Sequence, residues 1–227
     1  DNTSDATDVL REAIKNGYLS IVKYLLSVGT HLCKNEEGGF LIITRSCENQ
    51  YTLKDTLKLL LAATPVSINA INKNGEGDLH RAIRDYNGRD LDLINMLIEA
   101  GANVNMQDAD GQTPLHWAMA KCETTEFMRP VVWTLLKAGA NPKLVDKYEM
   151  TPLHVAKGFV IRLTVDLLVG AGLDINAIDW KGCTALHYQV TDIAAVKSLL
   201  KRGAEVNIKN EDGKTPLDLA RSESDNK

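Results

Sequence analysis

Four of the five histidines in this 227-residue chain are almost evenly spaced, and together they could ligate a metal or act as bases. They are His80, His116, His154 and His187, at intervals of 36, 38 and 33 residues. A zinc ion needs ligands that converge to about 2 Å from it. Residues this far apart converge only if the fold brings them together, so their chemistry depends on the elements that carry them.

The cysteines give no second route to a metal site. Cys33, Cys47, Cys122 and Cys183 are scattered, with no C-x-x-C pair and no histidine at zinc-site spacing. Cys47 or Cys122 could be a nucleophile only beside a base, and the sequence places none there. Scattered thiols of this kind are typical of a reduced, intracellular protein.

Other catalytic patterns are missing from the sequence. It contains no G-x-x-x-x-G-K-[ST], no G-x-G-x-x-G, no G-x-S-x-G and no H-E-x-x-H. The net charge of −4 gives no general attraction to nucleic acid, and no apolar run reaches the roughly 18 residues of a membrane span. We therefore predict no enzyme activity, no cofactor, no nucleic acid and no membrane insertion.

Each histidine lies in a repeated segment. DADGQTPLHWA (108–118), DKYEMTPLHVA (146–156), DWKGCTALHYQ (179–189) and NEDGKTPLDLA (210–220) align, and NKNGEGDLHRA (72–82) is a weaker copy. An apolar, helix-like run that ends in a small turn follows each of the first four in chain order, at 96–105, 134–143, 167–176 and 198–207. A period near 33 residues indicates a stacked array.

The motif has a physical explanation in each position. Asp108 and Gly111 suit a tight turn, Thr113 suits a helix N-cap, and Pro114 suits the first helical position. Gly139 follows the second apolar run, as a left-handed helix cap would. Each copy therefore predicts a turn, a helix, a second helix and a closing turn.

This pattern resembles the ankyrin-repeat family over nearly the whole chain. The resemblance implies an all-α solenoid of stacked helix-turn-helix units with projecting β-hairpin fingers. We predict one domain over 1–227, with repeats at 4–34, 35–71, 72–107, 108–145, 146–178, 179–209 and a partial C-terminal cap at 210–227. The chain starts without a Met and stops soon after a repeat begins, so we expect a fragment of a larger protein.

The resemblance also implies a structural role for the four histidines, which in this family bond backbone in the adjoining turns. Successive repeats lie on the order of 10 Å apart, which is too far for shared zinc ligands. We therefore predict no metal site.

Several copies depart from the pattern. Glu149 replaces a glycine, Gly77 and Asp78 replace Thr-Pro, and Gln189 replaces a small alanine, so we expect modest local stability there. Three consecutive units are lengthened, at 46–53, 85–91 and 121–127. These insertions are either a partner-specific surface or tolerated loop growth.

The resemblance implies that the finger tips and the exposed end of the first helix contact a protein or peptide partner. Fingers five and six carry large side chains there, and aromatic residues are enriched among interface anchors. The alternative is that these rings only pack on the neighbouring finger. The predicted contact residues are Tyr148, Met150, Trp180, Lys147, Lys181, Phe159, Asp110 and Gln112, with Phe159 near the end of a first helix and Cys183 also at a tip.

Trp133 is a second candidate. Corresponding second-helix positions are polar, namely Lys23, Lys58, Asn95, Asp166 and Lys197. Trp133 is either covered by the local insertion or marks a second contact on the back face.

These observations predict a non-catalytic, monomeric protein-protein interaction module: a scaffold, adaptor or targeting domain in the cytoplasm or nucleus. The alternatives are a substrate-recruiting repeat domain of a larger enzyme, an internal inhibitor or assembly unit of a channel or signalling protein, or a host-directed microbial or viral effector.

Overall fold

The computed structural model describes residues 2–30, 50–63, 68–86, 88, 91–121 and 128–224. In these ranges the chain forms eleven helices and no strand beyond a single bridge between Ile71 and Gly77. The predicted all-α repeat architecture is confirmed. None of the described helices is long and apolar enough to cross a membrane.

The chain divides into two compact units, one of Asp1–Ala82 with Asp92–Asn103 and one of Ile83–Leu91 with Val104–Lys227. The prediction of a single domain with the repeat boundaries given above stays a prediction. Of the four cysteines, Cys33, Cys47 and Cys122 lie outside the described residues.

The first unit is built on α1 (Asn2–Lys15), α2 (Leu19–Ser27) and α4 (Gln50–Ala63), with α2 in contact with both others. Leu10, Ile14 and Val22 are fully buried in it. Most of α6 (Leu91–Glu99) belongs to this unit, and α5 (Asp78–Asp85) is divided between the two units. Helices α1 and α2 occupy most of the range predicted for the first repeat, 4–34, and α1 begins before it, at Asn2.

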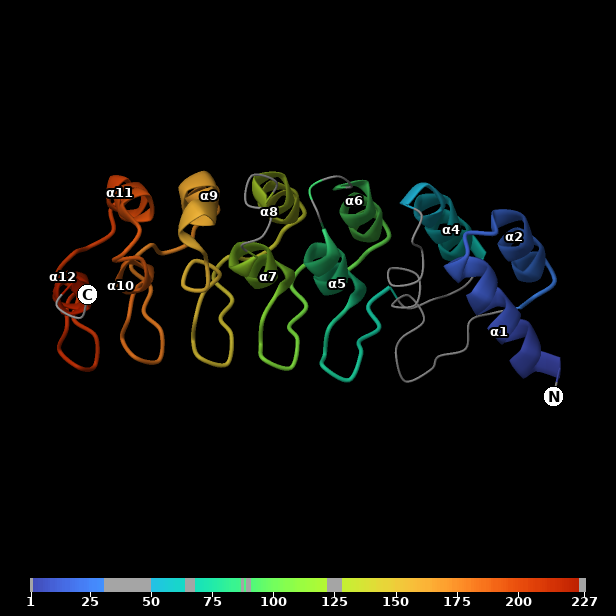
Figure 1. The fold of residues 1–227 in the computed structure, drawn as a ribbon, viewed down its shortest axis with the longest axis horizontal. Coiled ribbons are helices and arrows are strands. Elements are labelled where there is room, and N and C mark those ends of the chain that lie inside the picture. Colours follow the sequence, from blue (N-terminus) through green and yellow to red (C-terminus); the bar gives the residue numbers. More distant parts are fainter. Residues whose placement is uncertain are drawn as a thin grey trace. The chain divides into compact units, whose positions relative to one another are not determined.

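The second unit holds α7 (Pro114–Ala120), α8 (Met128–Lys137), α9 (Gly158–Gly170), α10 (Ala185–Tyr188), α11 (Ile193–Lys201) and α12 (Pro216–Ser224). Helices α8, α9 and α11 form one row in which each packs on the next. Helices α7, α10 and α12 lie beneath that row, and the loops project on the far side from it (Figure 1). Two helix layers therefore position the loops.

The motif histidines join neighbouring repeats within this unit. His116 Nδ1 accepts the backbone N–H of Thr113 at 3.1 Å, and this bond leaves its proton on Nε2. His116 Nε2 then donates to the Met150 carbonyl at 3.0 Å. The corresponding bonds of His154 and His187 go to the carbonyls of Cys183 and Lys214, at 3.0 and 3.2 Å. The predicted structural role of these three histidines is confirmed.

The first helix of repeat five is missing, contrary to the sequence prediction. Residues 152–154 form a turn and Val155 a bend, and α9 starts at Gly158 and runs for 13 residues. Gly158 lies so close to Asp192 that an added Cβ would come within 1.9 Å of Asp192 Oδ2. A side chain at residue 158 would therefore clash with Asp192, the N-cap of α11.

Gln189 compensates for the lost helix. A carbonyl in a continuing helix accepts an amide four residues later. The Ala156 carbonyl instead accepts Gln189 Nε2 at 3.0 Å, and Gln189 is buried. The departure from alanine at this position therefore has a specific hydrogen-bonding role.

Asp78, in repeat three, is buried without compensation. It is 1% exposed, and both of its carboxylate oxygens lack a hydrogen-bond partner among the described residues. Burial raises the pKa of Asp78 to about 7, although nearby Arg81 acts to lower it. An unpaired buried carboxyl is costly, which agrees with the expected weakness of this copy.

Parts of two of the three predicted insertions belong to helices, while Tyr86 and Gly88 lie between α5 and α6 outside any helix. Residues 50–53 belong to α4, and Asp85 and Leu91 belong to α5 and α6. The remainder, at 46–49, 87, 89–90 and 122–127, lies outside the described residues.

Candidate functional site

The fingers of the second unit are tight loops at residues 108–112, 146–150, 179–183 and 210–214, here called fingers four to seven. Each is closed by a backbone bond from its first residue to its last; Asp146 N donates to Met150 O at 3.0 Å. The Asp146 carboxylate also accepts the amides of Tyr148 and Met150, at 2.8 and 3.0 Å. Hairpin-like closure is thus present, although the described fingers contain no β-strand.

Backbone bonds also hold neighbouring finger tips side by side. Lys147 N donates to Asp110 O at 2.9 Å, and Glu211 N donates to Lys181 O at 2.9 Å. The bond at the middle junction, between fingers five and six, is longer: Trp180 N donates to Tyr148 O at 3.2 Å. The tips of the four fingers therefore form one continuous edge.

The middle junction also carries a strained residue. Glu149 has φ 56°, the only positive value for a non-glycine residue in the described chain, whereas Gly111 and Gly182 fill this position in fingers four and six. An added Cβ on Gly111 would lie 3.0 Å from Lys147 N, and one on Gly182 would lie 3.2 Å from Glu211 N. The predicted departure at Glu149 is therefore a backbone-strained position beside the longest of these bonds.

Tyr148 and Trp180 form an exposed aromatic pair across this junction. Their ring centroids are 6.4 Å apart with the planes tilted by 35°, and the residues remain 47% and 49% exposed. The two rings do pack on neighbouring fingers, as the alternative interpretation held, but about half of each residue still faces solvent. The Tyr148 and Trp180 rings therefore contact each other and still leave surface that a partner could contact.

Cations border the aromatic pair. Lys147 Nζ lies 5.0 Å from the Tyr148 ring centroid, and Lys181 Nζ lies 4.9 Å from that of Trp180. Lys147 Nζ also donates to Asp110 Oδ1 at 2.7 Å, and this bond raises the pKa of Lys147. These contacts define what we call the finger-tip surface: Asp110, Lys147, Tyr148, Trp180 and Lys181.

The other predicted residues are placed differently. Gln112 and Met150 are half-buried at the finger base, where the Met150 carbonyl is bound by His116. Phe159 lies in the first turn of α9, not at the end of a first helix, with the Arg162 guanidinium 4.4 Å from its ring. No ring contact among the described residues joins Phe159 to the finger tips.

Cys183 is not an exposed tip residue. It is 6% exposed, its thiol accepts Asn210 Nδ2 at 3.5 Å, and burial raises its pKa. A thiol with a raised pKa is a poor nucleophile. Within the described ranges, no group of three or more His, Cys, Asp or Glu side chains could hold a metal ion.

Two aromatic residues beneath the fingers escaped the sequence prediction. Trp117 Nε1 donates to Asp108 Oδ2 at 2.9 Å, and the Tyr188 hydroxyl donates to Asp179 Oδ2 at 2.5 Å. Tyr188 is 40% exposed, and Trp117 is half-buried. Both directly follow a motif histidine, and that shared position is the signal that could have found them. They extend the aromatic surface from the fingers toward α7 and α10.

Trp133 lies apart from these residues on α8. It is 51% exposed, with Lys137 Nζ 5.6 Å from its ring. The insertion expected to cover it, at 122–127, lies outside the described residues, so the two interpretations of Trp133 remain open.

Comparison with known proteins identifies the architecture. The family described as "Ankyrin repeats (3 copies)" matches residues 10–108, 79–179 and 126–210. The chain is 32% identical over 154 residues to neurogenic locus notch homolog protein 1 of Homo sapiens, and 33% identical over 153 residues to those of Mus musculus and Danio rerio. These matches cover 66–67% of the chain but span 6% of the length of each relative.

Proposed function

Because this chain belongs to the ankyrin-repeat family, we propose that it is a non-catalytic module that binds another protein through its finger-tip surface. The observation that carries this proposal is the aromatic pair, which is half exposed on a scaffold fixed by backbone hydrogen bonds. Exposed tyrosine and tryptophan on a rigid scaffold supply contact area at little conformational cost.

The charges around the pair indicate how a partner segment would be oriented. Lys147 and Lys181 offer ammonium groups beside the rings, while Asp110 already holds one side of Lys147. We expect a segment with an apolar or aromatic anchor beside carboxylates, because the anchor fills the space over the rings and the carboxylates meet the lysines. Tyr188 would extend the contact toward α10.

A selection experiment tests the proposal without a known partner. Peptides from a randomised displayed library are selected on the intact chain, and the affinity of each winner is measured against Tyr148→Ala and Trp180→Ala. We expect each variant to weaken binding about tenfold or more, as anchor truncations do.

The matched control is Tyr24→Ala, because Tyr24 is 66% exposed but lies on α2 in the other unit. Circular dichroism confirms that each variant is folded. The finger-tip surface would be refuted if no winner bound the finger variants more weakly than the unaltered chain.

Trp133 remains a candidate second contact on α8. Its exposure of 51% agrees with this role. Trp117 and Trp180 are replaced by Phe so that Trp133 alone fluoresces, and we expect red-shifted emission that a soluble quencher reduces strongly. Blue-shifted, quencher-resistant emission would mean that the insertion covers the ring.

We further propose an intracellular location, on the basis of the scattered cysteines and the buried, unpaired thiol of Cys183. The similarity to notch homologues supports the repeat architecture, and it spans too little of their length to transfer a role. Recruitment of substrates for a larger enzyme, or of host proteins by a microbial or viral effector, would use the same surface.

A further inference from the structure

The outer helices of the second unit carry a cluster of cations. Helices α8, α9 and α11, which pack side by side in one row, hold five basic residues and a single acidic residue, Asp166. Asp166 is already paired with Arg129, at 3.4 Å. The basic residues, all exposed, are Arg129, Lys137, Arg162, Lys197 and Lys201. The net charge of the whole chain is −4, so this helix row reverses the sign of the charge locally.

The opposite side of the same unit is acidic. Fingers four to seven together hold seven acidic residues and three lysines, and they project on the far side from the helix row (Figure 1). The layer of helices α7, α10 and α12 lies between the two sides, and one such layer is about 10 Å thick. Charges separated by more than about 8 Å are largely screened at physiological salt. An anionic partner is therefore attracted to the helix row although the chain is acidic.

Trp133 lies among these cations. It is 51% exposed, and Lys137 Nζ lies 5.6 Å from its ring. Arg129, Trp133 and Lys137 follow one another at intervals of four residues, so they share one face of α8. Tryptophan is enriched at the interface between membrane and water, and basic residues are attracted to anionic lipids. An exposed indole between two cations therefore suits the surface of an anionic bilayer.

The stability of the helices does not account for all of these cations. Lys137 and Lys201 lie in the last turns of α8 and α11, where a cation also stabilises the helix dipole. Arg162 and Lys197 lie before the last turns of their helices, and neither makes an ion pair with a described residue. These two exposed charges thus have no partner charge in the described chain, which favours a role in contacting something else.

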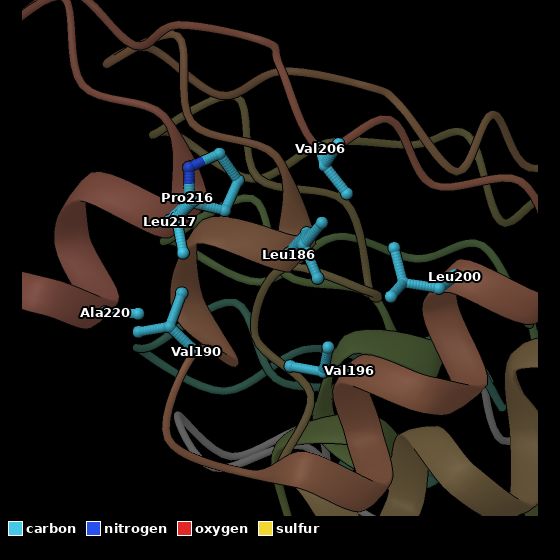
Figure 2. A pocket seen from close by; sticks show the side chains of 8 residues that line it. All are labelled: Leu186, Val190, Val196, Leu200, Val206, Pro216, Leu217 and Ala220. Carbon is cyan, nitrogen blue, oxygen red and sulfur yellow. The ribbon is translucent and has the colours of Figure 1, made fainter.

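The cations also lie apart from the apolar pocket of this unit. Val196 and Leu200 of α11 face that pocket, which lies between α10, α11 and α12 (Figure 2). Lys197 and Lys201 each follow one of them by one residue, which is about 100° further around the helix. A partner helix binds in an apolar groove, whereas these lysines belong to a charged outer face. The arrangement favours a broad anionic surface as the partner.

We propose that the α8, α9 and α11 row binds the surface of an anionic membrane without crossing it. The five basic side chains meet the lipid phosphates and carboxylates, and the Trp133 indole lies at the level of the headgroups. The acidic fingers then face away from the bilayer, so the finger-tip surface stays accessible to a protein partner. Membrane binding by this row does not rest on the finger-tip proposal.

Vesicles of two compositions test the proposal. The 227-residue chain is sedimented with vesicles of equal parts phosphatidylcholine and phosphatidylserine, and separately with vesicles of phosphatidylcholine alone. We expect binding to the mixed vesicles only, and weaker binding at higher salt, because each cation near an anionic surface contributes about fivefold in affinity. Equal binding to the two kinds of vesicle, or no binding to the mixed ones, would overturn the proposal.

Charge reversals locate the contact. Lys197→Glu with Lys201→Glu should weaken binding to the mixed vesicles about twentyfold or more. The matched control is Lys209→Glu with Lys214→Glu, which changes the net charge equally at exposed positions next to and in finger seven, and it should bind as the unaltered chain does. Circular dichroism confirms that both proteins are folded. Equal losses in the two variants would mean that the net charge, and not the helix row, determines binding, and would overturn the proposal.

The fluorescence of Trp133 gives a second measurement. Trp117 and Trp180 are replaced by Phe, and the emission of Trp133 should then shift to the blue when mixed vesicles are added and be quenched by brominated lipid. Emission that stays unchanged while the protein sediments with the vesicles would overturn the proposal, because Trp133 would not contact the bilayer.

Other anionic partners give distinct results. If the row binds an acidic protein segment, soluble polyglutamate will bind with the same dependence on Lys197 and Lys201, and the mixed vesicles will not bind. If it binds nucleic acid, a DNA duplex will replace polyglutamate in that result. Loss of vesicle binding in Tyr148→Ala with Trp180→Ala would place the lipid at the finger tips. Each of these results would overturn membrane binding by the row and leave peptide binding at the fingers to its own test.

Discussion

The junction between fingers four and five differs from the junction between fingers five and six, although the motif builds both. The first has Gly111 at its contact, a backbone bond of 2.9 Å and an exposed Lys147–Asp110 ion pair. The second has Glu149 in a left-handed conformation, a bond of 3.2 Å and the exposed aromatic pair. The motif thus tolerates strain where it presents aromatic surface.

The two junctions share their buried anchors. His116 and His154 make the same bonds, each 3.0 Å to a carbonyl of the next finger. The difference is confined to the exposed tips, so surface chemistry varies while the scaffold is retained. Variants of the exposed tips and of the buried histidines therefore test separately what distinguishes the two junctions and what they share.

The largest expected effect is at the junction between fingers four and five, which has the shorter backbone bond. Gly111→Ala combines a left-handed alanine with a Cβ 3.0 Å from Lys147 N, and we expect a loss of about 3 kcal/mol in unfolding free energy. Urea denaturation measures it. Gly139→Ala is the matched control, because Gly139 has φ 90° with nothing near its Cβ position, and it should cost only about 1–2 kcal/mol. Equal losses in the two variants would show that the close packing of fingers four and five contributes nothing to the unfolding free energy.

Acidification should weaken both junctions alike. Burial lowers the pKa of His116 and of His154 below 6.5, so below pH 6.5 the unfolded chain takes up protons that the folded chain resists. Their contribution to stability is therefore full above pH 6.5 and declines as pH falls toward the folded values. The loss reaches up to about 1.4 kcal/mol per histidine one pH unit below 6.5.

Urea denaturation at several pH values gives the slope of the unfolding free energy against pH. We expect His116→Gln and His154→Gln to reduce this slope by similar amounts. Asp78 acts in the opposite direction, because its raised pKa makes its contribution decline as pH rises from about 4 to about 7. Measuring the histidine variants in Asp78→Asn protein removes the contribution of Asp78 to the pH dependence. If neither histidine variant reduced the slope, the pH dependence would not come from His116 and His154.

Relief of strain should narrow the difference between the junctions. Glu149→Gly removes a left-handed non-glycine residue, and we expect a gain of about 0.5–1 kcal/mol after the larger entropy loss of glycine is included. Hydrogen exchange at the Trp180 amide should slow as its bond to Tyr148 shortens. Glu149→Gln keeps the backbone strain and should change neither quantity; a gain in that variant would point to charge instead.

The smallest expected effect is at the exposed ion pair. Asp110→Asn removes the partner of Lys147 at 2.7 Å, in a pair whose side chains are 59% and 48% exposed. Exposed pairs contribute little, so Tm should move by about 1 °C or less. Calorimetry measures it, and a fall of several degrees would mean that the pair helps to hold the two fingers together.

Much of this arrangement could be predicted from the sequence because the motif specifies local geometry. Asp146 at the start of its finger and His116 after its cap make the bonds that their positions predicted. The exposed aromatic pair could also be predicted, since Tyr148 and Trp180 occupy tip positions without core contacts.

The errors came from contacts between repeats, which a motif does not encode. TPLHVA has the same helix-start pattern as the other copies, yet its residues form a turn and a bend, and the next helix, α9, begins at Gly158. Phe159 was misplaced for the same reason. Cys183 is buried because Asn210 of the following finger covers it, and no feature within its own repeat indicated that.

The bond from Gln189 to the Ala156 carbonyl has a consequence for engineering. Consensus design averages each alignment column independently, and it would return residue 189 to alanine as an apparent improvement. Here that change would remove the donor that the Ala156 carbonyl has in Gln189, in the repeat that lacks its first helix. Gln189 and the missing first helix of repeat five are therefore coupled. A redesign that places alanine at 189 should also restore that helix.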